Sequence, residues 1–74
     1  MDKINERLQE LYQRREITQK LVDKRAKEFA AAFAEYRAET TPLAAFKLSM
    51  AQGSYEQYAR ELSAIKAQIS EFEI

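Results

Sequence analysis

The sequence predicts an all-α fold: a long N-terminal helix that folds back through a Thr-Thr-Pro turn onto one or two further helices, as a helical hairpin or three-helix unit with coiled-coil-like packing. Two observations predict it. The chain of 74 residues holds one glycine, Gly53, and one proline, Pro42, so few positions can interrupt a helix. Its apolar residues recur every three or four positions, which places them on one face of a helix. We therefore expect residues 1–74 to form a single helical domain.

The first expected helix covers residues 2–39. Leu11, Val22 and Phe33 are spaced eleven residues apart, and this period indicates a nearly straight helix rather than a left-handed supercoil. We expect the apolar face of this helix to pair with the returning part of the chain. The predicted intramolecular seam consists of the apolar and aromatic residues Val22, Phe29, Phe33, Tyr36, Tyr55, Tyr58, Leu62, Ile65 and Ile69.

A polar interruption divides the apolar face of the first helix at Arg15 and Thr18. One interpretation is that the face shifts there towards Ile17 and Leu21. The other is that a polar layer fixes the register of the pairing, as polar core residues do in coiled coils. Because an unpaired arginine is costly to bury, the shift is favoured.

The turn is predicted at Thr41-Pro42. A residue before proline avoids the helical region, and proline is favoured at the first position of a helix that threonine can cap. A second helix is expected over residues 42–52 and a third over residues 54–73. The third helix would start at the segment 54–57, which matches a capping box.

Gly53 can act in two ways. The bulky apolar residues before it lie on a different helical face from those that follow it, which together with the capping box favours a break or kink. These residues are Leu43, Phe46 and Met50. The alternative is one continuous helix over residues 42–73, because Leu48 and Ala51 are in phase with the heptad seam that runs from Tyr55 to Phe72. The glycine would then cost about 1 kcal/mol of helix stability.

Composition excludes several classes of function. Twelve basic and twelve acidic residues cancel, so the chain as a whole has no bias towards nucleic acid or membrane. Without histidine or cysteine it lacks the commonest general base and the imidazole and thiolate ligands of zinc. We therefore expect no enzyme, no cofactor and no metal site. A signal peptide and a membrane span are not apparent either, so we expect a soluble, cytoplasmic protein.

Helices of this length carry more apolar surface than so short a chain can cover, so we expect another copy or a different protein to complete the core. A last helix that began at residue 54 would be too short to cover the first one, and the N-terminal end would stay exposed. The interface to a partner or to other copies is therefore predicted at the two ends of the chain, at Ile4, Leu8, Leu11, Tyr12, Phe72 and Ile74.

The segment Met50–Tyr58, followed by Leu62 and Ile65, resembles the glycine turn and Gln-Tyr helix start of the small co-chaperones that hold type III secretion needle subunits. The resemblance covers about twenty residues, and its elements are common to helical hairpins in general. The long first helix and the Thr-Thr-Pro turn have no clear counterpart in that family. The resemblance thus illustrates a class of small helical assembly chaperones and does not assign the chain to one family.

The leading hypothesis is a non-enzymatic protein–protein interaction module that oligomerises, binds a partner's helix, or both, as small assembly chaperones, scaffolds, adaptors and phage-type inhibitors do. A second hypothesis is a nucleic-acid-binding helical module that uses the basic stretch 14–27, with an affinity that falls steeply with salt. A third is a structural subunit of a virion or filament, which would grow beyond a small closed oligomer.

Overall fold

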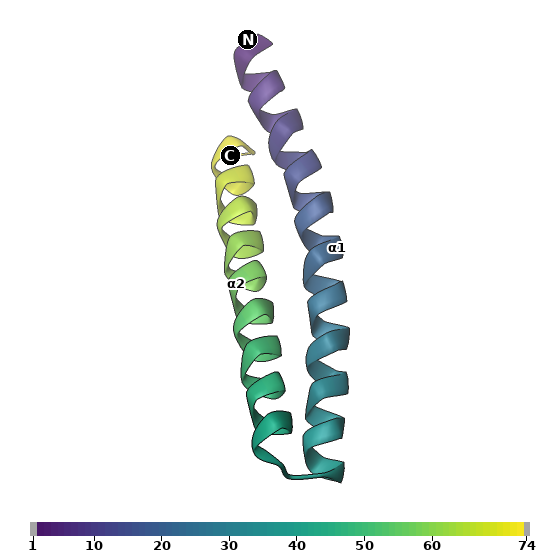
Figure 1. Ribbon diagram of the computed structural model, residues 1–74. Coiled ribbons are helices and arrows are strands. Elements are labelled where there is room, and N and C mark those ends of the chain that lie inside the picture. The colour runs from purple at the N-terminus through teal and green to yellow at the C-terminus, as the bar shows by residue number, and fades with distance from the viewer. Residues whose placement is uncertain (1, 74) are drawn as a thin grey trace.

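Two antiparallel helices joined by a short turn make up residues 2–73, which the computed structural model describes (Figure 1). α1 covers Asp2–Ala38 and α2 covers Pro42–Phe72. The hairpin is a rod of 56 × 15 × 15 Å, and the N-terminal end of α1 projects beyond the end of α2 (Figure 1). The predicted all-α hairpin is confirmed, with one returning helix rather than two.

The Thr-Thr-Pro turn forms as the sequence predicts. Thr41 has an extended backbone (φ −109°, ψ 159°), and its hydroxyl accepts a hydrogen bond from the backbone N–H of Ala44 at 3.1 Å. This cap satisfies one of the free N–H groups at the start of α2, where Pro42 takes the first position. Before the turn, the Thr40 hydroxyl donates to the carbonyl of Tyr36 at 3.2 Å. Local hydrogen bonds therefore end one helix and start the next.

The expected break at Gly53 does not occur. α2 passes through the glycine without a positive φ angle, and Ser54 lies inside the helix instead of capping a new one. The glycine turn of the co-chaperone resemblance is therefore not formed. The physical reason is that the seam continues in phase from Ala44 through Leu48 and Ala51. The residues before and after Gly53 therefore pack against α1, which offsets the roughly 1 kcal/mol that glycine costs a helix.

The seam of α2 follows the predicted heptad spacing. Its buried residues are Ala44, Leu62, Ile65 and Ile69, while Tyr55 and Tyr58 are half-buried between them. The best-buried cluster of the molecule unites Leu11 of α1 with Ile65 and Ile69, and Leu8 and Tyr12 pack against it. This cluster lies towards the end of the hairpin that is opposite the turn (Figure 1).

The seam of α1 corrects one predicted residue. Val22, Phe29 and Tyr36 are half-buried, as expected, but Phe33 is 48% exposed and Ala32 takes the seam position instead. The eleven-residue spacing placed Phe33 in line with Leu11. Because α2 repeats every seven residues, the face of α1 that stays in contact with it also repeats every seven, and Phe33 falls beside the seam.

The polar interruption of α1 forms a polar layer rather than a shift of the face. Thr18 is buried in the seam, whereas Ile17 is exposed. Arg15 avoids burial by lying along the surface, with its guanidinium carbon 5.1 Å from the centre of the Tyr12 ring. The favoured interpretation is thus wrong, because only the small threonine enters the seam and the arginine needs no buried partner.

Candidate protein interface

The outer stripe of α2 is the most exposed apolar surface of the hairpin. It consists of Leu43, Phe46 and Met50, whose exposed fractions are 62%, 62% and 61%. These residues are spaced by three and four positions, so they form one row. The row faces away from α1, because the seam positions Ala44 and Leu48 lie on the opposite side of the same turns.

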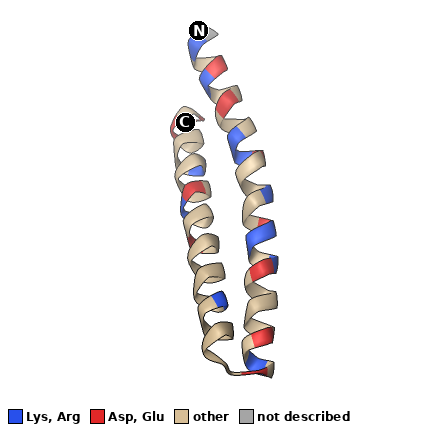
Figure 2. Cartoon of the chain, viewed as in Figure 1, with Lys and Arg blue, Asp and Glu red and all other residues tan. Residues whose placement is uncertain are grey.

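Few charges surround the outer stripe. Lys47 is the one charged residue of the segment 42–55, and its ammonium group lies 3.4 Å from the carboxylate of Glu35. Figure 2 shows this part of α2 as almost uncharged. Gly53 extends the row by one more turn, and no atom lies within 4 Å of where its side chain would be. A helix that packed on the stripe would therefore meet apolar side chains and a bare backbone.

A second apolar surface is a shallow groove on the side of α1, lined by Ala26, Phe29, Ala30 and Phe33. The Phe29 ring packs against Tyr55 of α2, with 5.8 Å between the ring centres, so this side chain is held in place. Phe33 stands at the rim of the groove and is half exposed. The two alanines leave room in which a side chain from another molecule can lie.

The predicted interface at the chain ends needs correction at Leu11, whereas Leu8 and Tyr12 are half-buried. Leu11 is fully buried inside the hairpin, and Leu8 and Tyr12 pack against its cluster. The Tyr12 hydroxyl also donates a 2.6 Å hydrogen bond to the carboxylate of Glu73. Because α2 is continuous, it is long enough to reach the residues that a shorter last helix would leave uncovered. Ile4 and Phe72 remain exposed, and Ile74 lies outside the described residues.

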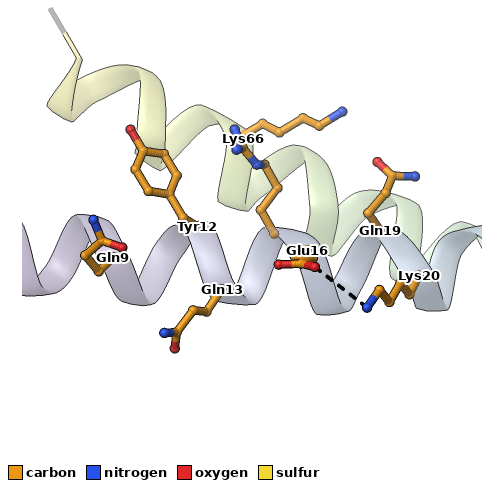
Figure 3. Close-up of a pocket in the computed structure, with 8 residues that line it drawn as sticks. Gln9, Tyr12, Gln13, Glu16, Gln19, Lys20 and Lys66 are labelled. Atoms are coloured by element: carbon orange, nitrogen blue, oxygen red, sulfur yellow. Dashed lines mark ion pairs between the residues drawn. The ribbon is translucent and has the colours of Figure 1, made fainter.

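Beside Tyr12 lies an open polar groove between the helices (Figure 3). Figure 3 shows Tyr12 reaching from α1 towards the C-terminal end of α2, and the Glu16–Lys20 ion pair, with a separation of 3.7 Å, along α1. The hydrogen bond to Glu73 raises the pKa of Tyr12, because the carboxylate accepts a hydrogen bond that only the protonated phenol can donate. Beside this groove, the hydrogen bond between Tyr12 and Glu73 joins α1 to the C-terminal end of α2.

The basic stretch 14–27 does not form a uniformly basic face. Arg25 lies half-buried beside Tyr58, 5.6 Å from the ring centre, and forms a 2.8 Å ion pair with Glu28. That pair raises the pKa of Arg25, mainly through its hydrogen bond to the carboxylate. Two acidic residues, Glu16 and Asp23, lie among the six basic ones along this part of α1 (Figure 2).

No protein-family model, curated protein or solved structure matches the chain. Within residues 2–73, no group of three acidic side chains is placed to hold a metal ion. Over the same residues, neither helix has a stretch long and apolar enough to cross a membrane.

The outer stripe is the surface that the sequence-based site prediction missed. The signal was present, since Leu43, Phe46 and Met50 lie on a different helical face from the seam residues that follow them. From the sequence alone, that difference favours a broken helix. In a continuous α2, the same difference places these three side chains on the outside.

Proposed function

We propose that this protein is a non-enzymatic, cytoplasmic protein–protein interaction module, in which the half of the hairpin next to the turn, residues 21–56, is covered by another copy or by a helix of a partner protein. The observation that carries the proposal is the exposure of the outer stripe. Assembly chaperones, scaffolds, adaptors and inhibitors that present a helical face to a partner all belong to this class.

The energetic argument concerns the cost of leaving such side chains in water. Complete burial of a leucine, phenylalanine or methionine contributes about 1.5–3 kcal/mol each. The three residues of the outer stripe are contiguous, with Lys47 as the one charged residue of the segment around them, and contiguous apolar patches of this kind mark interaction sites. A hairpin of two helices has one layer too few to enclose them.

The stability of the isolated chain tests the proposal. Mass by light scattering after size exclusion, and the melting temperature by circular dichroism, are measured over a wide range of concentration at low and high salt. A mass or melting temperature that rises with concentration supports the proposal, because association stabilises the folded state. A monomer with partial helicity and a low melting temperature also supports it.

Other outcomes contradict the proposal. One is a monomer that melts cooperatively at a high temperature, independent of its concentration. Such a chain would be stable without another molecule packed on its outer stripe. Assembly that continues without a closed end point would favour a structural filament subunit. Binding to DNA or RNA that weakens steeply with salt would favour a nucleic-acid module.

A further inference from the structure

One side of α1 carries a row of residues that is complementary to itself. We call it the side stripe: Asp23, Ala26, Ala30, Phe33 and Arg37. The residues are spaced by three, four, three and four positions, so they form one row of the helix. Its middle is the apolar groove, and its two ends bear opposite charges.

We propose that the side stripe is the contact of a two-fold symmetric homodimer, in which the α1 helices of two copies pack antiparallel across Ala30. The inference rests on the proposed function and names its first partner, a second copy of this chain. The outer stripe of α2 takes no part in this contact, so a dimer presents two free outer stripes.

The spacing of the residues fits a two-fold axis at Ala30. Asp23 lies seven residues before it and Arg37 seven residues after it, so an antiparallel copy places each carboxylate opposite a guanidinium. A parallel pair would instead place like charges together. Charge complementarity therefore selects the antiparallel arrangement.

The apolar part of the stripe obeys the same symmetry. Phe33 lies three residues after Ala30, and Ala26 lies four before it, so the Phe33 ring of one copy meets the groove beside Ala26 of the other. A two-fold contact requires the projecting group and its receiving space on one face of one molecule, and the side stripe carries both.

The charges at the ends of the stripe are available. Within residues 2–73, Asp23 accepts a hydrogen bond from Gln19 at 3.0 Å and Arg37 lies 5.8 Å from the centre of the Phe33 ring, but neither forms an ion pair. On the opposite side of α1, the charged residue already has a partner. Glu35 lies about 200° around the helix from Phe33 and pairs with Lys47 of α2. The charged ends of the side stripe can therefore form ion pairs with a second copy.

The contact is short, about 21 Å from Asp23 to Arg37 along the fifteen residues of helix, which is less than a standard stable interface requires. We therefore expect a reversible dimer, with dissociation in the micromolar range.

Charge reversal tests the pairing of Asp23 with Arg37. Asp23→Arg alone and Arg37→Asp alone each place like charges opposite one another, and we expect each to weaken the dimer about tenfold. The double variant restores opposite charges and should recover most of the affinity. Sedimentation equilibrium gives the dissociation constants. Glu61→Arg, at an exposed position of α2, is the matched control and should leave the constant unchanged.

Disulfide cross-linking tests the position of the two-fold axis. Because the chain contains no cysteine, an introduced cysteine is the one thiol that can react. Helices that cross at alanine approach to about 8 Å between their axes, which brings the two Cα atoms at the crossing into the range of about 4.4–6.8 Å that a disulfide spans. Oxidised Ala30→Cys should therefore form covalent dimers rapidly. Ala31→Cys, about 100° around the same helix, is the control and should do so slowly.

The outcomes separate this inference from the proposed function. One outcome is a dimer that resists both single charge reversals and dissociates with Phe46→Glu. That result would show that the contact uses the outer stripe; it overturns the side-stripe dimer and leaves the proposed interaction module intact. Equal cross-linking at residues 30 and 31 likewise overturns it. A stable monomer, whose melting temperature does not depend on concentration, overturns both.

Discussion

The two halves of this hairpin bury their apolar residues to different depths. In the open half, residues 2–20 and 57–73, the large aliphatic side chains of Leu11, Leu62, Ile65 and Ile69 are buried between the helices. In the turn half, residues 21–56, the one buried apolar residue is Ala44. Four large apolar residues of that half lie on the outside, namely Phe33, Leu43, Phe46 and Met50, whereas its seam residues Val22, Phe29, Tyr36 and Leu48 are half-buried.

The difference follows from which residue types occupy the seam. Leucine and isoleucine at seam positions fill the space between two helices and are sealed by their neighbours. The turn half places alanine at Ala32, Ala44 and Ala51, so small side chains share its seam with half-buried larger ones such as Phe29 and Tyr55. The bulky residues that lie outside this seam are available to other molecules. One half of the molecule maintains the fold, and the other half forms a surface.

A charge in the open half should have the largest effect. Ile65→Asp would bury an unpaired carboxylate in the Leu11 cluster, and we expect loss of the folded state at a cost above about 4 kcal/mol. Circular dichroism would show the loss of helicity. Ala64→Asp introduces the same charge one residue earlier, on the exposed side, and should stay helical. Equal damage from both variants would mean that the seam is not the site of the core.

A matched pair of leucines gives the sharpest comparison between the halves. Leu11 is fully buried, whereas Leu43 is 62% exposed. We expect Leu11→Ala to cost about 2–5 kcal/mol of unfolding free energy and Leu43→Ala less than about 0.5 kcal/mol. Urea denaturation at a concentration that keeps the chain monomeric measures both. If Leu43→Ala proved the more damaging, the outer stripe would be packed within the chain.

A gain in stability is expected at the glycine of the turn half. Gly53 lies inside α2 with open space at its side-chain position, so Gly53→Ala should stabilise the monomer by about 1 kcal/mol. The reverse change at an exposed helical site, Ala64→Gly, should destabilise by a similar amount. No gain at residue 53 would indicate that the helix is interrupted there in solution.

The smallest effect concerns the polar closure of the open half at high pH. The hydrogen bond to Glu73 raises the pKa of Tyr12 above its usual value of 10.0. Its contribution to stability is therefore complete below about pH 10 and is lost as the pH rises through the higher pKa of the folded state. Unfolding free energies from about pH 8 to about pH 12 should show a decline that is smaller in Tyr12→Phe. An identical decline in both chains would mean that the bond does not form.

Much of the fold follows from local patterns. Thr41-Pro42 marks the turn because capping and proline geometry involve only neighbouring residues. The heptad that starts at Tyr55 predicts the seam of α2 correctly as far as Ile69 for the same reason, since the helical period is a property of the backbone, while Phe72 stays exposed. The predicted interface was less accurate, because Leu11 is covered by a part of the chain that is far away in sequence.

The sequence by itself determined that this protein is helical, where it turns, and that it holds neither histidine nor cysteine, because these properties depend on residue types and short spacings. Only the tertiary structure decided that α2 continues through Gly53, that Ala32 rather than Phe33 faces α2, and that the outer stripe stays exposed. Each of these depends on the register of one helix against the other. That register is set by the summed packing of the whole seam, which no local pattern contains.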